Sequence, residues 1–215
     1  MVTIVQGASV SKSKRYWNVI SNGLLLFGIR NRLAKIGFDF RPYYWVQEEV
    51  TPCDEPKIKG DVSTYKVRYL NLDELKTIAV NLPKQLAVEV IDSFKKGQLC
   101  IGLEHNHKIA AYTFVETNDF VFNHKPYNLK SNEAYLLNMW TFHEYRGKNL
   151  APFLRYQAYQ LLKEQGRDTK YSITEYFNKS SIKFKAKLNS EHQKLVLSII
   201  LFKKIYWNFL LKDYK

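Results

Sequence analysis

The sequence predicts a mixed α/β (α+β) fold, and three observations support that prediction. From about residue 62 the hydrophobic pattern predicts a strand, two helices, three strands, a helix, a strand, a helix and two final strands. The composition, 46% hydrophobic and 25% charged, is ordinary for a soluble globular protein. A chain of 215 residues is long enough for one domain with a full core and an extension.

Residues 1–61 are expected to form an N-terminal extension. Its start, 1–12, is predicted to be disordered, and apolar residues at helical spacing predict a helix over 14–37. Residues 39–50 are aromatic and extended in pattern, and 51–61 contain two prolines and few apolar residues, as linkers do.

Residues 62–215 are expected to form the main domain. The predicted strands are 64–70, 99–104, 108–116, 134–141, 171–176, 194–202 and 205–211, and the predicted helices are 72–81, 83–97, 150–165 and 178–188. Asn71, followed by acidic first-turn residues, is the expected N-cap of the first helix. The stretch between residues 117 and 132 is expected to be a polar loop.

The most informative segment is the turn from Arg146 to Ala151, which joins a predicted strand to a predicted helix. The first N–H groups of a helix lack intrahelical partners, and the helix dipole favours an anion there, so such a turn suits a phosphate. Arg146 and Lys148 add two cations. Asn149 readily adopts the left-handed conformation that such turns need. The alternative is an ordinary loop with solvated charges.

Two segments resemble the GNAT (GCN-five-related N-acetyltransferase) superfamily. Arg146-Gly147-Lys148-Asn149-Leu150-Ala151 resembles its acyl-CoA signature, Arg/Gln-x-x-Gly-x-Gly/Ala, with Asn149 at the middle glycine. The segment 178–189 is similar to Asn-x-x-Ser/Ala-x-x-Phe-Tyr-x-Lys-Leu-Gly-Phe and matches it at Asn178, Ser181, Phe184, Lys187 and Leu188. The resemblance covers about residues 62–215. It implies a central mixed, mostly antiparallel sheet, splayed at the acyl-CoA site and flanked by helices.

The resemblance also implies a set of binding residues for acetyl-CoA, the acyl donor. The main chain of Met139, Trp140 and Thr141 is expected to contact the pantetheine arm. The diphosphate is expected on the turn, and Asn178 and Ser181 are expected near the cofactor. The turn residues are Arg146, Gly147, Lys148, Asn149, Leu150 and Ala151. No metal site is predicted.

Acetyl transfer to an amine needs a base and can use an acid that protonates the departing thiolate. We predict Glu175 as the base; an ion pair with Lys179 is the structural alternative. In many family members the acid is a Tyr at the position of Lys185, which the sequence leaves either as a donor or as a solvated lysine. Tyr176 or Tyr171 on the neighbouring strand are the substitutes.

The net charge of +13 is concentrated in residues 131–215. Such a field suits an anionic ligand, nucleic acid or an acidic membrane surface. No nucleic-acid-binding signature is present, so no specific nucleic-acid partner is predicted. Residues 24–35 and 199–212 mix apolar, aromatic and cationic residues, as membrane-surface segments do. With no convincing secretion signal, the protein is expected in the cytoplasm or at the inner membrane surface. The sequence leaves a homodimer open.

The resemblance therefore implies an acyl-CoA-dependent N-acyltransferase with a small-molecule amine acceptor. Aromatic residues outside the common fold suit a ring-shaped acceptor, such as an amino sugar on a nucleotide or lipid carrier. They include Tyr43, Tyr44, Trp45, Phe120, Phe122 and Tyr127. The alternative is a protein of GNAT fold that acts at a membrane surface, or binds acyl-CoA, without catalysis.

Overall fold

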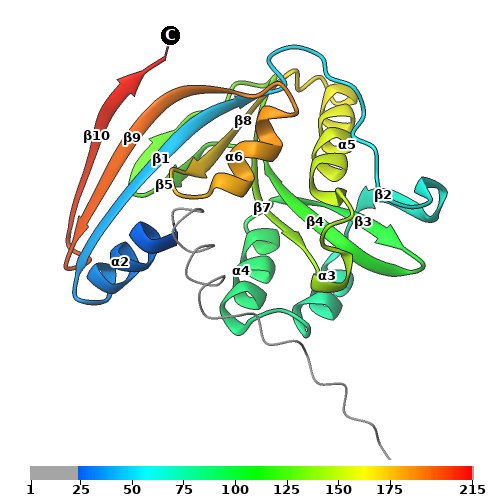
Figure 1. Cartoon of the computed structure of the whole chain (residues 1–215), viewed down its shortest axis with the longest axis horizontal. Helices are drawn as coiled ribbons and strands as arrows, with labels where there is room; N and C mark the ends of the chain where they lie inside the picture. The colour runs from blue at the N-terminus through cyan, green and yellow to red at the C-terminus, as the bar shows by residue number, and fades with distance from the viewer. Residues whose placement is uncertain (1–23, 215) are drawn as a thin grey trace, which may run out of the picture.

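A computed structural model describes residues 24–214 of the chain (Figure 1). The helices are α2 (Leu24–Lys35), α3 (Leu72–Ala79), α4 (Lys84–Lys95), α5 (Leu150–Glu164) and α6 (Lys179–Ala186), with short 3₁₀ turns η1 (Val62–Thr64) and η2 (His143–Tyr145). The strands are β1 (Phe38–Glu48), β2 (Tyr65–Tyr69), β3 (Leu99–His105), β4 (Lys108–Glu116), β5 (Phe120–Phe122), β6 (Lys125–Tyr127), β7 (Glu133–Thr141), β8 (Thr169–Glu175), β9 (Glu191–Leu201) and β10 (Ile205–Asp213).

Eight strands form one sheet in the order β10-β9-β1-β8-β7-β4-β3-β2. The neighbours β7 and β8 are parallel, and every other pair of neighbours is antiparallel. The sheet is therefore mixed and mostly antiparallel, as the family resemblance implied.

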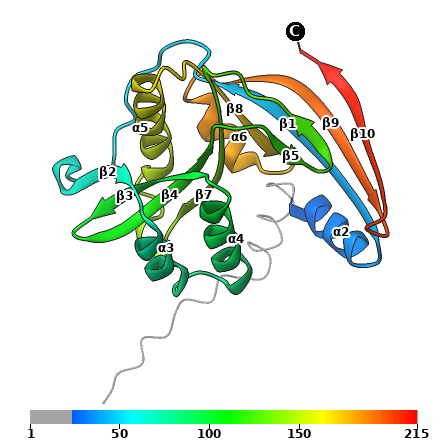
Figure 2. The same ribbon diagram turned by 180° about the vertical axis from the view of Figure 1, so that it is seen from behind.

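Helices pack on both faces of this sheet (Figures 1 and 2). Ala111 and Val115 of β4 belong to the core cluster that contains α5, whereas Tyr112 and Phe114 belong to the cluster that contains residues of α3 and α4. Because adjacent strand residues point to opposite faces, α5 lies on one face and the α3–α4 pair on the other. Strand β4 is therefore buried between these layers.

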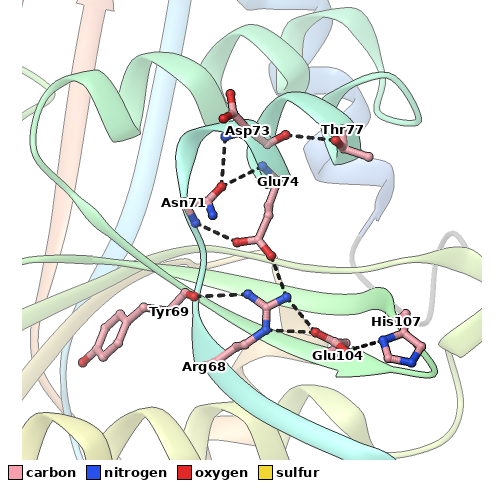
Figure 3. Close-up of polar contacts among 8 residues, drawn as sticks. All are labelled: Arg68, Tyr69, Asn71, Asp73, Glu74, Thr77, Glu104 and His107. Atoms are coloured by element: carbon pink, nitrogen blue, oxygen red, sulfur yellow. Dashed lines mark hydrogen bonds and ion pairs between the residues drawn. The ribbon is translucent and has the colours of Figure 1, made fainter.

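Asn71 is the N-cap of α3, as expected, and it forms a capping box there. The side chain of Asn71 accepts hydrogen bonds from the N–H groups of Asp73 and Glu74, and the Glu74 carboxylate accepts one from the Asn71 N–H. Glu74 also pairs with Arg68, which pairs in turn with Glu104 of β3 (Figure 3). This network ties the first turn of α3 to strands β2 and β3.

The position of strand β1 does not fit the expected boundary between an extension, 1–61, and the main domain, 62–215. It pairs with β8 on one side and β9 on the other, so part of the predicted extension lies inside the central sheet. Tyr43 and Val46 are buried there, and a register shift at Trp45/Val46 accommodates an extra residue of β9. Helix α2 lies within the predicted helix 14–37. The part of that helix before residue 24, and the segment 1–12, lie outside the described residues.

The segment between residues 117 and 132 is more structured than the predicted polar loop. Strands β5 and β6 form a separate two-stranded hairpin. Rings from this hairpin stack near Trp45 of β1 and Tyr135 of β7, which fixes its position over the sheet. In the described part of the chain, no helix is long and apolar enough to cross a membrane.

Candidate functional site

The site begins where two parallel strands separate. Strands β7 and β8 pair only over Glu133–Tyr135 and Thr169–Tyr171, at the start of each strand. Beyond Tyr135 and Tyr171 the two strands have no residue pairs with each other, although β7 still pairs with β4 and β8 with β1. One edge of each strand therefore presents main-chain groups that the sheet does not use, which is the splay that the family resemblance implied.

A bulge bends β7 within this splay. Asn138 has φ of 48°, and the register against β4 shifts between Tyr112 and Phe114. Met139, Trp140 and Thr141 follow the bulge and lie on the open part of β7. The structure thus brings all three of these predicted residues onto the edge where a ligand arm can bind to the main chain.

The turn after β7 has the backbone that the sequence predicted. Gly147 has φ of 80°, and Asn149 is in the left-handed region with φ of 65° and ψ of 26°. Asn149 is the N-cap of α5, but its side chain makes no capping bond to the helix. The first turn of α5, which starts at Leu150 and Ala151, is therefore left without a side-chain cap at the end where an anion is favoured.

The segment before η1 completes the turn. The Asn149 side-chain amide donates to the Lys57 carbonyl at 2.8 Å, and the Lys59 N–H donates to the Lys148 carbonyl at 3.0 Å. These bonds align residues 57–59 beside the turn. The linker assignment of 51–61 had given no sign that this segment contributes to the site.

A cavity of about 580 Å³ lies over the turn, and its lining contains four cations and no carboxylate. The cations are Lys57, Lys59, Arg146 and Lys187. The Arg146 Nε donates to the Thr141 carbonyl at 3.1 Å, and its guanidinium lies 5.2 Å from the centre of the Trp140 ring. Lys148, the other predicted cation, lies over the Tyr145 ring. The cavity combines a helix N-terminus with fixed positive charge, which suits a diphosphate.

A second cavity, of about 690 Å³, shares Arg146 with the first and is also lined by Trp140. Arg68, Glu74 and His107 line it, from the network drawn in Figure 3. His107 is almost fully exposed at the tip of the β3–β4 hairpin. Among the described residues, no group of His, Cys, Asp and Glu could hold a metal ion.

Beneath the splay lies a buried charge cluster that joins three elements. Glu48 of β1, Arg155 of α5 and Lys185 of α6 are all buried. The Glu48 carboxylate is 3.3 Å from the Arg155 Nε and 3.2 Å from the Lys185 Nζ. The Tyr159 hydroxyl also donates to Glu48, at 2.5 Å. The sequence had left open whether Lys185 faces water, and the structure shows that it does not.

Lys185 reaches β8 as well. Its Nζ donates to the hydroxyls of Ser172 and Thr174, each at 2.6 Å. Both residues belong to the strand that has separated from β7. The ammonium therefore holds α6 against one wall of the splay.

Burial, together with the sharing of one carboxylate by two cations, sets the pKa values of Glu48 and Lys185. Burial alone raises the pKa of Glu48, but the charges of Arg155 and Lys185 and the hydrogen bonds it accepts outweigh burial and lower it to about 2. Burial, with a smaller contribution from the Arg155 charge, lowers the pKa of Lys185 to about 8 against the pull of Glu48. For Lys185, the attraction of the shared carboxylate does not offset the cost of burial together with the repulsion by Arg155.

The predicted base lies at the open end of the splay. Glu175 is the last residue of β8, its side chain is 39% exposed, and its Oε2 is 3.8 Å from the Arg30 guanidinium of α2. Tyr176 follows it and stacks on Tyr44, with ring centroids 5.5 Å apart. Tyr44 also stacks on His192, whereas Tyr43 and Trp45 contact the β5–β6 hairpin. Because adjacent strand residues alternate in direction, Tyr44 lies on the face opposite the other aromatic residues with which the sequence grouped it.

Asn178 has a local role at the start of α6. Its side-chain oxygen accepts a hydrogen bond from the Ser181 N–H at 3.1 Å, which makes it the N-cap of the helix. Asn178 and Ser181 thus set where α6 begins. This position in turn directs Lys185 into the sheet.

Sequence reasoning missed Glu48, Arg155, Lys57 and Lys59. A signal for Glu48 was present, because it continues the period-two pattern of Tyr44 and Val46 on one face of β1. No local pattern marks Arg155, whose burial depends on the partner that β1 supplies.

The sequence of residues 69–189, more than half of the chain, matches the Acetyltransferase (GNAT) family. No curated protein matches the chain. Among solved structures, the fold is similar to an acetyltransferase from the GNAT family of Colwellia psychrerythraea, at 15% identity over 76% of this chain and 57% of that chain, with a TM-score of 0.55. It is also similar to a GNAT-family protein of Novosphingobium aromaticivorans, at 16% identity over 77% of this chain and 66% of that chain, with a TM-score of 0.52.

A further similar structure is described as a GCN5-related glucosamine N-acetyltransferase region of a fungal multi-domain GH3 β-N-acetylglucosaminidase. The identity is 11%, and the match covers 90% of this chain and 23% of that chain with a TM-score of 0.55. This chain thus spans less than two thirds of each of the three proteins. Identities this low show only a shared fold. Family membership is shown by the sequence match over residues 69–189. The chain belongs to the GNAT acetyltransferase family.

Proposed function

We propose that the protein is an acyl-CoA-dependent N-acyltransferase that transfers an acetyl group from acetyl-CoA to a small-molecule amine. The observation that carries this proposal is the opening between β7 and β8 together with the cationic turn from Arg146 to Ala151. We assign the diphosphate to the turn and its cations, and the pantetheine arm to the free main-chain edge of Met139, Trp140 and Thr141. Membership of the GNAT family supports acetyl-CoA as the donor.

In the proposed reaction the amine nitrogen attacks the thioester carbonyl, so a C–N bond forms and the C–S bond breaks. The nitrogen loses a proton to Glu175, directly or through water, and the CoA thiolate takes a proton from Tyr176. The products are an amide and CoA. Lys185 stands where many relatives have a tyrosine acid, but its ammonium is engaged by Glu48, Ser172 and Thr174. We therefore assign Lys185 to holding α6 and β8 together.

We propose a ring-shaped amine, such as an amino sugar on a nucleotide or lipid carrier, as the acceptor. The support is the group of rings that the β5–β6 hairpin brings against the sheet, which offers flat apolar surface. These rings come from Trp45, Phe120, Tyr127, Tyr135 and Tyr171. The fungal region of similar fold is described as acting on glucosamine, and the cationic residues of the C-terminal half suit a phosphate-containing carrier.

The test of the donor is a calorimetric titration with acetyl-CoA and with dephospho-CoA, followed by thiol release with a panel of amines that includes amino-sugar nucleotides. We expect acetyl-CoA to bind, and to bind more tightly than dephospho-CoA because the cavity is cationic. Absence of acetyl-CoA binding would refute the donor assignment. Binding without thiol release from any amine would favour the alternative, an acyl-CoA-binding protein without catalysis.

The test of the base is Glu175→Gln. We expect this change to lower kcat with the amine that the panel identifies, because an amide cannot take the proton, and to leave the Kd for acetyl-CoA unchanged. Glu191→Gln, an exposed change on β9, is the control. An unaltered kcat would remove Glu175 from the mechanism without affecting the donor assignment.

A further inference from the structure

Two turns that are far apart in the sequence form one corner of the molecule. The α2–β1 turn and the β9–β10 turn lie side by side (Figure 1), and the Phe202 N–H donates to the Gly37 carbonyl at 2.6 Å. The rings of Phe38 and Phe202 meet edge to face with centroids 5.0 Å apart. Gly37 has φ of 96°, and a side chain there would come within 2.6 Å of the Phe202 ring. The packing of these two turns is therefore specific.

The corner and the adjoining strand expose apolar side chains. We define the corner surface as Leu33, Ile36, Phe38, Phe202 and Ile205, all of which are exposed, Ile36 and Phe202 by more than half. Along β10, the last strand of the sheet, Trp207 and Phe209 are exposed on the same face as Ile205. Exposed apolar side chains gathered in this way mark a site of interaction.

Cations surround the corner surface. Arg32 and Lys35 of α2, and Lys203 and Lys204 of the β9–β10 turn, are exposed beside it. Within residues 28–40 and 202–205 the one carboxylate is Asp39, and it pairs with Arg30 and Arg41. Apolar and aromatic side chains flanked by cations are the combination that binds an anionic lipid surface.

The charges favour an anionic surface over a second copy of the chain. In a symmetric contact between two corner surfaces, Arg32, Lys35, Lys203 and Lys204 of one copy would meet the same cations of the other. We propose that the corner surface docks the protein on an anionic bilayer, with the apolar residues in the headgroup region and the cations on the phosphates.

The experiment is cosedimentation of the full chain with sucrose-loaded vesicles of phosphatidylcholine, alone or mixed with phosphatidylglycerol. We expect binding to the anionic vesicles and little to the neutral ones. Lys203→Gln/Lys204→Gln should weaken that binding by about 25-fold, at about fivefold for each lysine. Ile36→Ser should weaken it as well, because it removes an inserted apolar side chain.

Matched controls exist on α4 and after α3. Lys95→Gln/Lys96→Gln removes an adjacent exposed lysine pair, and Val80→Ser removes an exposed apolar side chain. We expect both controls to bind vesicles as the unaltered protein does, and all variants to bind acetyl-CoA equally in solution. Failure to bind anionic vesicles, equal loss in the controls, or a dimer in sedimentation velocity that Ile36→Ser dissociates would each overturn the proposal. None of these results bears on the transferase assignment.

Discussion

Replacing Glu48 by glutamine is expected to destabilise the protein by about 3–5 kcal/mol, because it leaves Arg155 and Lys185 buried without their counter-charge. Glu48 accepts contacts from both cations and from the Tyr159 hydroxyl. An amide matches the shape of the carboxylate but supplies no charge. The loss is large because burial prevents water from solvating the cations that remain.

The measurement is the free energy of unfolding from urea denaturation. Glu191→Gln on β9 serves as the control, since its side chain is exposed and should change stability by less than about 0.5 kcal/mol. A second variant, Glu48→Met/Lys185→Met, removes an oppositely charged pair together and should recover part of the stability. A loss below about 1 kcal/mol for Glu48→Gln would show that the cluster does not stabilise the fold as described.

The same carboxylate sets an acid limit to stability. The folded-state pKa of Glu48 is about 2, below its usual value of 4.5, so its contribution is complete above about pH 4.5 and is lost as the pH falls towards 2. Lys185 affects stability in the alkaline range. Its folded-state pKa of about 8 lies below the usual 10.5, so its buried charge lowers stability fully below pH 8. This loss is relieved as the pH rises from 8 to 10.5. In Glu48→Gln, the acid-dependent loss between pH 4.5 and 2 should be smaller.

Glu48 also shows where sequence reasoning stopped. The elements themselves followed from local patterns: Asn71 supplies its own capping bonds, and the hydrophobic periods are properties of single segments. Strand order depends on pairing between segments that are distant in the chain. The aromatic, extended residues 39–50 predicted a strand, but nothing within them specified β8 and β9 as the neighbours. The charge cluster could not be predicted before that neighbour relation was known.

The candidate site likewise has one part that the sequence predicts and another that it does not. Its centre, the turn at Gly147 and Asn149, was predictable because the turn depends on the conformational preferences of a few consecutive residues. Its outer wall was not. Lys57 and Lys59 reach the turn through two hydrogen bonds between segments about 90 residues apart, and prolines nearby predicted only a linker. Local chemistry thus predicts the turn to which we assign the diphosphate and its cation Arg146, whereas the place of Lys57 and Lys59 in the cavity lining depends on the whole fold.

Asn149 gives the sharpest test of the site, and its replacement by valine is expected to weaken acetyl-CoA binding by about five- to 150-fold. Asn149 has φ of 65°, which costs a β-branched residue about 1–3 kcal/mol. The turn should therefore rearrange and withdraw the N–H groups at the start of α5 from the phosphates. The measurement is the Kd for acetyl-CoA by calorimetry.

Asn149→Gly separates the two contributions that asparagine makes. Glycine adopts the left-handed conformation freely, but it loses the hydrogen bond to the Lys57 carbonyl. If the backbone conformation is what binds the diphosphate, Asn149→Gly keeps the Kd within a few-fold of the unaltered protein while Asn149→Val does not. If both variants lose binding equally, the side-chain bond that holds residues 57–59 beside the turn is the essential feature. Unchanged binding in Asn149→Val would place the diphosphate elsewhere, because a rearranged turn cannot present the same N–H groups.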